Sequence, residues 1–151
     1  MRFIYLVLLL LLSVLAGCDE WKITPVSLEG TPLVGNWYGE RQETAGDRSI
    51  HDRLFVQVRE SGEVDYHFIG CERGGGSTKT EKRLNLQQMP IKRLTTVKMV
   101  LQRYPLTPSF ELTLGAWPDQ AEGAWVVDGI ALLPVEGAVL PEPDSWQCEE
   151  P

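Results

Sequence analysis

Hydrophobic and polar residues alternate over the middle of the chain with the period of a β-strand. Residues 54–58 and 64–69 each place apolar side chains at every second position, and the turn 60–63 between them contains Gly62. Alternation on both sides of a glycine turn is typical of a β-hairpin. These two segments therefore predict a pair of neighbouring antiparallel strands.

Shorter apolar segments elsewhere predict the remaining strands. A second hairpin is expected in residues 123–133, because Asp-Gly between apolar runs is the strongest short hairpin signal. Residues 42–49 are expected to form a polar loop, and Met89-Pro90 is expected to break the chain. The other predicted strands cover residues 33–40, 78–86, 94–104 and 110–114. Seven or eight short strands without a long helical period predict an all-β antiparallel meander.

The two ends of this meander resemble those of a known family. Gly35-x-Trp37-Tyr38 at the start, and Gly123-x-Trp125 followed by Asp128-Gly129 near the end, are similar to lipocalins and to small bacterial lipocalin-like domains. The resemblance covers roughly residues 33–135. It implies a small barrel or half-open barrel with Trp37 closing one end. Up-and-down barrels of about eight strands hold one small ligand or fill their interior with side chains.

The aromatic side chains of the predicted strands have two interpretations. In the first, Trp37, Tyr66, Phe68 and Trp125 line an apolar pocket and bind a ligand. In the second, the same side chains fill the hydrophobic core. Both interpretations fit the sequence.

The first 18 residues have the layout of a bacterial lipoprotein signal. Arg2 precedes an uncharged apolar run that is too short for a spanning helix, which needs about 20 apolar residues. Leu15-Ala16-Gly17-Cys18 resembles the lipobox at all four positions. The resemblance implies cleavage after Gly17, a diacylglyceryl thioether on Cys18 and a further fatty acyl chain, such as palmitate, on the new amino terminus. The alternative is an ordinary signal peptide followed by a chance cysteine.

The residues after Cys18 indicate which membrane holds the protein. Asp19 with its acidic neighbour Glu20 resembles lipoproteins that enteric-type bacteria retain. This implies a lipid-anchored protein on the periplasmic side of the inner membrane, with the outer membrane as the alternative. The predicted organisation is a signal peptide (1–17), a lipidated N-terminus and tether (18–33), a lipocalin-like β domain (34–135) and a Pro- and Glu-rich tail (136–151).

The mature chain is acidic. Removing residues 1–17, whose one charged side chain is Arg2, leaves 134 residues with 13 basic and 21 acidic side chains. Such a protein is not expected to bind nucleic acid. Segment 73–103 is nevertheless basic, with eight Lys and Arg against one Glu. It is either a set of solvated strand faces beside acidic ones, or a positive face toward anionic lipid or polymer.

Two cysteines remain besides Cys18, namely Cys71 and Cys148. An even pair in the oxidising periplasm predicts a disulfide, which would hold the tail against the domain. The alternative is two free thiols.

Signals for catalysis are weak. His51 and His67 flank the hairpin, so with Asp52 or Asp65 they form a candidate metal site, although isolated strand histidines are more often structural. No serine has a Gly-x-Ser-x-Gly elbow, and the glycine run 74–76 lacks the Gly-Lys-Ser/Thr of a phosphate loop. We therefore predict no enzyme, no metal and no cofactor.

Two functions fit these expectations. The first is a membrane-anchored, non-catalytic binding module for an apolar small molecule or an envelope protein. The second is a structural accessory subunit that docks an envelope complex through its outer β surface or through the basic segment 73–103. The sequence does not predict the oligomeric state.

Overall fold

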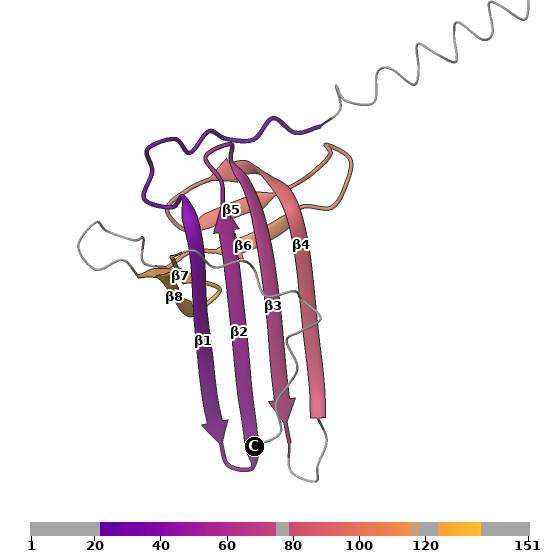
Figure 1. The fold of residues 1–151 in the computed structure, drawn as a ribbon. Helices are drawn as coiled ribbons and strands as arrows, with labels where there is room; N and C mark the ends of the chain where they lie inside the picture. Colours follow the sequence, from indigo (N-terminus) through magenta and orange to yellow (C-terminus); the bar gives the residue numbers. More distant parts are fainter. Residues whose placement is uncertain (1–21, 75–78, 116, 118–123, 137–151) are drawn as a thin grey trace, which may run out of the picture.

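The computed structural model describes residues 22–74, 79–115, 117 and 124–136, and their regular structure is entirely β (Figure 1). The strands are β1 (Gly35–Ala45), β2 (Arg48–Val58), β3 (Glu63–Arg73), β4 (Lys79–Leu94), β5 (Lys98–Leu101), β6 (Phe110–Thr113), β7 (Trp125–Val127) and β8 (Ile130–Pro134). The predicted all-β antiparallel meander is confirmed. Within these described ranges, no helix is long and apolar enough to span a membrane.

One eight-stranded sheet contains all the strands, in the order β6-β5-β4-β3-β2-β1-β8-β7. Each pairing joins strands that follow one another in the chain, except that β8 also pairs with β1 through Trp37 and Tyr38. The sheet curls strongly, and its two edges meet at an isolated bridge between Leu114 and Val127. The result is the half-open barrel that the sequence predicts.

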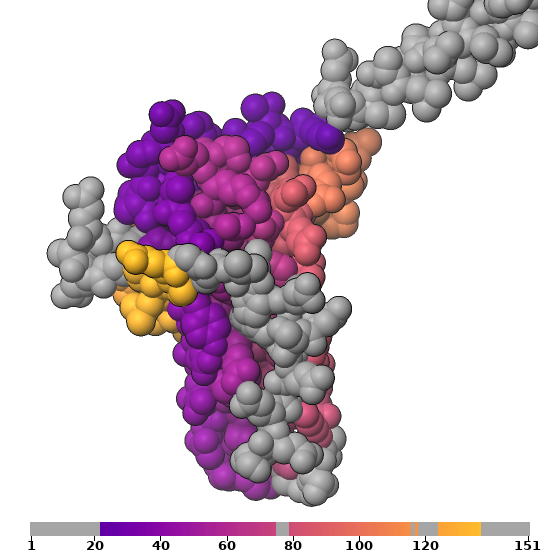
Figure 2. Space-filling view, in the orientation of Figure 1, coloured from indigo at the N-terminus to yellow at the C-terminus, as the bar shows by residue number. Residues whose placement is uncertain are grey.

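The first four strands are much longer than the last four. Strands β1 to β4 have at least 11 residues each, whereas β5 to β8 have five or fewer. All eight form the half-barrel at one end, and β1 to β4 continue beyond it as a narrow four-stranded sheet (Figures 1 and 2). We call this projecting part, residues 40–53, 69–74 and 79–83, the blade. Its inner face continues the face that carries the core, and its outer face is opposite.

The blade includes residues 42–49, for which the sequence predicts a polar loop, and this prediction is wrong. β1 continues to Ala45, and only two residues connect it to β2. Ion pairs across neighbouring strands join Arg41 to Asp52 and Arg48 to Glu72. Because opposite charges facing each other across strands stabilise a sheet, these strands form without apolar alternation.

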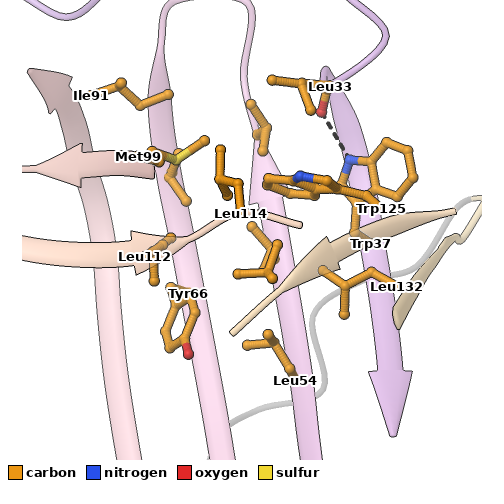
Figure 3. Close-up of a cluster of buried hydrophobic side chains, with 14 of the residues drawn as sticks. Leu33, Trp37, Leu54, Tyr66, Ile91, Met99, Leu112, Leu114, Trp125 and Leu132 are labelled. Atoms are coloured by element: carbon orange, nitrogen blue, oxygen red, sulfur yellow. Dashed lines mark hydrogen bonds between the residues drawn. The ribbon is translucent and has the colours of Figure 1, made fainter. Parts of the chain in front are cut away.

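The hydrophobic core fills the half-barrel. Trp37 and Trp125 meet edge to face with ring centroids 5.7 Å apart. Trp37 Nε1 donates a hydrogen bond to the carbonyl oxygen of Leu33 at 2.8 Å (Figure 3). All eight strands contribute buried apolar side chains, among them Leu54, Val56, Tyr66, Ile91, Met99, Leu101, Leu112, Leu114, Val127, Ile130 and Leu132. The barrel interior is therefore occupied by side chains.

The described part of the predicted tether packs against the barrel. Leu28 and Leu33 are buried in the core. Backbone amides of Ile23 and Val26 donate to the carbonyl oxygens of Arg103 and Ile91 at 3.1 and 3.0 Å. The folded unit thus begins by residue 22, earlier than the expected boundary at residue 34.

Two expectations about β4 and β5 are wrong. Met89-Pro90 does not break the chain, because β4 passes through it with a register shift within the barrel. Gln88 has a φ of 50° beside this shift. The expected strand 94–104 contains a turn at residues 95–97, and β5 is only four residues long. Proline is tolerated at such irregularities, where a ladder hydrogen bond is already missing.

The hairpin predicted around Asp128-Gly129 is confirmed. β7 and β8 pair from Val127 and Ile130 outward. Asp128 and Gly129 have φ values of 50° and 77°, as a two-residue hairpin turn with two left-handed positions requires. This turn lies next to β1 and β3, which makes it part of the site described below.

Candidate functional site: a groove on the inner face of the blade

A groove of about 210 Å³ lies on the inner face of the blade, where the packed core ends. Its lining combines apolar and charged side chains, including Arg41, Arg48, Ile50, Asp52, Phe68 and Lys82. Cross-strand register explains why they meet: Arg41 is opposite Asp52, Asp52 is opposite Gly70, and Gly70 is opposite Lys82. These residues form one row across the four long strands.

An ion pair forms the central part of this row. The Arg41 guanidinium donates to Asp52 Oδ2 from Nη2 at 2.5 Å and from Nε at 3.1 Å. Asp52 is only 5% exposed, whereas Arg41 remains partly open to solvent. The hydrogen bond to Asp52 raises the pKa of Arg41 further above its ordinary value. Arg41 is therefore a fixed positive group at the edge of the groove.

Gly70 keeps the groove open. A Cβ atom at this position would lie 2.8 Å from Asp52 Oδ1 and 3.0 Å from the Phe68 ring. Any larger residue would thus fill the space between the ion pair and the aromatic ring. The glycine gives the groove its depth.

The Asp128-Gly129 turn lies beside the ion pair, because a Cβ atom on Gly129 would be 3.3 Å from Arg41 Nη1. The Asp128 carboxylate accepts hydrogen bonds from the Tyr66 hydroxyl at 3.1 Å and from the Thr113 amide at 2.8 Å. Burial, followed by the charge and the hydrogen bond of Asp128, raises the pKa of Tyr66 above its ordinary value. The turn is therefore tied to β3 and β6.

The outer face carries other polar groups. Glu40 accepts hydrogen bonds from the Tyr38 hydroxyl and contacts His51 Nε2 at 3.0 Å. The Tyr38 hydrogen bond lowers the pKa of Glu40. Asp65 pairs with Arg59 at 2.5 Å, and although burial raises its pKa, the hydrogen bonds from Arg59 and from a backbone amide lower it overall.

The outer face is also partly inaccessible. Phe55, His67 and Ile69 are at most 5% exposed, although Phe55 and Ile69 do not belong to the core cluster. Within the described part of the chain, both ring nitrogens of His67 lack a hydrogen-bond partner, and burial lowers the pKa of this histidine. These three side chains therefore offer little surface to a partner.

The structure separates the four predicted ligand-binding residues. Trp37, Tyr66 and Trp125 lie in the packed core. Phe68 packs at the edge of the core and lines the groove. Only Phe68 therefore lies where a partner from solution has access without opening the barrel.

The histidines of the candidate metal site do not approach each other. Both lie on the outer face, but His51 pairs with Cys71 and His67 with Phe55, four residues further along each strand. At the rise of a β-strand this places them about 13 Å apart. Asp52 is on the opposite face. Over the ranges that the structure covers, no three His, Cys, Asp or Glu side chains are grouped as metal ligands.

The cysteine predictions fall largely outside the described residues. Cys71 lies on β3, facing the outer side. Cys18 and Cys148 both lie outside the described residues. The lipid anchor and the Cys71–Cys148 disulfide therefore stay predictions.

The groove was not predicted from the sequence, although one residue pattern indicates it. Asp52 has the same parity as Leu54, Val56 and Val58, so an acidic residue occupies the apolar side of the strand. Buried carboxylates are rare unless they are paired. That position predicts a buried ion pair, but its partner Arg41 could be identified only from the register of β1 and β2.

Comparison of the chain with known protein families, with curated proteins and with solved structures gives no match.

Proposed function

We propose that the protein is a non-catalytic binding module of the bacterial cell envelope that docks a protein partner through the inner face of its blade. Acyl chains on Cys18 anchor it to the periplasmic side of the inner membrane. The half-barrel acts as a rigid scaffold, and the groove receives a side chain of the partner. In this proposal the protein is neither an enzyme nor a nucleic-acid binder.

The main support for this proposal is that the barrel interior is filled by side chains, whereas the blade has an open groove. The barrel interior is filled by Trp37, Trp125 and Tyr66, which leaves no described space for a ligand beside them. The groove holds about 210 Å³, which is below the usual 300–1,000 Å³ of a small-molecule pocket. A groove of this size is suited to one apolar or acidic side chain of a protein partner.

Charge favours a partner with an acidic group. Arg41, Arg48 and Lys82 line the groove, against the acids Asp52 and Glu72. Arg41 and Arg48 already pair with those two acids, so Lys82 supplies an excess positive charge. Ile50 and Phe68 offer the apolar contact. A partner segment that presents an acidic residue next to an apolar one matches this surface.

The anchor and the disulfide complete the proposal. The Leu15-Ala16-Gly17-Cys18 sequence supports lipidation, and Asp19 supports the inner membrane. Pairing of Cys71 with Cys148 would restrain the tail next to the blade and would stabilise the fold by a few kcal/mol in chain-entropy models. Mass spectrometry of the mature protein, with and without reduction, tests both modifications.

Photo-crosslinking in living cells tests the docking. A photoreactive amino acid replaces Thr80, which lines the groove beside Lys82, and the matched control carries it at Leu133, which is 59% exposed on β8. We expect one protein partner in constant stoichiometry from position 80 and not from position 133. Adding Ile50→Glu should abolish this product without lowering the amount of folded protein. Equal products from both positions, or a product insensitive to Ile50→Glu, would contradict the proposal.

A further inference from the structure

The structure shortens the chain segment between the expected lipid anchor and the folded domain. Lys22 is the first described residue, and the amide of Ile23 is already hydrogen-bonded to the Arg103 carbonyl oxygen at 3.1 Å. Only three residues, 19–21, lie between Cys18 and Lys22, so the two are four Cα-to-Cα steps apart. A fully extended chain of that length spans about 14 Å. The end of the barrel near Lys22 must therefore lie close to the bilayer if Cys18 is lipidated.

A loop with an exposed apolar residue lies at this same end. Residues 103–107 follow β5, and Leu106 is 87% exposed. Arg103 and Tyr104 line a shallow pocket of about 500 Å³ together with Lys22 and Ile23. Figures 1 and 2 show the N-terminal segment reaching this end of the molecule, opposite to the tip of the blade.

The loop is held in a fixed shape. The buried Gln102 donates from Nε2 to the carbonyl oxygens of Pro105 and Thr107 at 3.1 and 2.6 Å. Thr107 is bonded back to Tyr104 through its amide and its hydroxyl. These internal hydrogen bonds hold the backbone of the loop in one conformation. Leu106 is therefore kept at the surface in a defined position. A single exposed leucine is ordinary at a protein surface, so what matters here is its position at the end of the barrel nearest the expected anchor.

The surroundings of the loop are positively charged. Lys22 and Arg103 line the pocket, and Lys92 Nζ donates to Gln102 Oε1 at 2.6 Å directly behind the loop. Glu63 is the acidic side chain of the pocket. Basic side chains next to an anionic leaflet add to its attraction for a protein. This charge contrasts with the acidic chain as a whole.

We propose that this end of the barrel, formed by Lys22, Lys92, Arg103, Tyr104 and Leu106, is a membrane-contact face that binds an anionic phospholipid surface. Leu106 inserts between the headgroups, Tyr104 lies at the interface, and the cations contact the phosphates. This inference rests on the lipid anchor of the proposed function. It fixes the orientation of the molecule, because the blade then points away from the membrane, into the periplasm.

Site-specific fluorescence on the full lipidated protein tests this orientation. An environment-sensitive fluorescent amino acid replaces Leu106, and the matched control carries it at Asp47, at the tip of the blade. The two ends of β2 are already about 33 Å apart at the rise of a strand. The protein is reconstituted in vesicles of phosphatidylethanolamine and phosphatidylglycerol, with and without nitroxide-labelled lipid.

We expect a blue shift and nitroxide quenching at position 106 and neither at position 47. Replacing Arg103 by Glu, or phosphatidylglycerol by phosphatidylcholine, should reduce the quenching at 106 several-fold. Identical signals at the two positions would overturn the membrane-contact face. Flotation of the protein with the vesicles reports the anchor separately. A protein that does not float contradicts the proposed anchor, whereas one that floats without quenching at 106 contradicts only this inference.

Discussion

The two core tryptophans should differ in their contribution to stability, because only one of their indole N–H groups is hydrogen-bonded within the described residues. Trp37 Nε1 donates to the Leu33 carbonyl oxygen at 2.8 Å. Trp125 is fully buried, and among the residues that the structure describes its Nε1 has no hydrogen-bond partner. The two rings pack against each other, so replacement of either by Phe removes a similar apolar area. Only the polar contribution should therefore distinguish Trp37→Phe from Trp125→Phe.

The expected difference in unfolding free energy follows from hydrogen-bond energetics. A typical intramolecular hydrogen bond contributes about 1 kcal/mol, and a buried unsatisfied donor costs about 1–3 kcal/mol. Trp37→Phe loses the first, whereas Trp125→Phe removes the second. The two contributions add, so Trp37→Phe should be more destabilising by about 2–4 kcal/mol. With a urea m-value of about 1–3 kcal/mol/M, this separates the two unfolding midpoints by about 1 M or more.

Urea unfolding followed by far-UV circular dichroism measures both midpoints. The m-value of the wild type has to be retained in both variants, because a changed m-value would indicate a different denatured state. If Trp125→Phe destabilises the protein as much as Trp37→Phe does, Trp125 Nε1 is not an unsatisfied donor in the folded protein. That result would contradict the predicted difference in unfolding free energy. A small cost for both variants would also contradict a core in which these rings are tightly packed.

Three further predictions concern single positions. Burial lowers the pKa of His67, so the folded state binds fewer protons than the unfolded state. The free energy of unfolding is therefore greatest above about pH 6.5 and declines as the pH falls through the lowered pKa of His67. In His67→Gln, the urea midpoint should change less between about pH 7.5 and 5.5 than it does in the wild type. Asp128→Ala removes two hydrogen bonds, one from the Tyr66 hydroxyl, and should cost about 1–3 kcal/mol in urea unfolding. Gly39→Ala would place Cβ against the Ala131 carbonyl oxygen, and thermal unfolding should show a loss of about 1–3 kcal/mol from this overpacking.

Local sequence patterns predicted the fold class and the two hairpins. Alternation in residues 54–58 and 64–69 predicts β2 and β3, because one face of these strands is buried in the core. The Asp128-Gly129 pair predicts the β7–β8 turn, because few residues adopt the left-handed conformation that such a turn requires. These signals are local, so a single sequence reveals them.

The blade could not be predicted in this way, because its stability depends on pairing between strands. Residues 42–49 have no apolar alternation and become strand only through partners such as Asp52 and Glu72 on neighbouring strands. The same reason explains the missed groove. Arg41, Asp52 and Gly70 are far apart in the chain, and only the register of three strands brings them together.

The N-terminal segment was difficult to predict for a different reason. Pro25, Gly30 and Pro32 suggest an extended tether, yet Leu28 and Leu33 are buried in the core. Two apolar residues without a period carry little information about packing. Their burial brings the start of the folded domain close to Cys18 in the chain, and the proposed orientation at the membrane depends on this.

The half-barrel is filled by side chains, and we propose that binding takes place on the blade instead. Titration of the protein with fatty acids and envelope phospholipids, followed by intrinsic tryptophan fluorescence, distinguishes these two places of binding. Because Trp37 and Trp125 are already packed against protein atoms, we predict no saturable shift of their emission. A saturable shift that Trp125→Phe abolishes would place a ligand inside the barrel, and it would contradict a barrel interior filled by side chains.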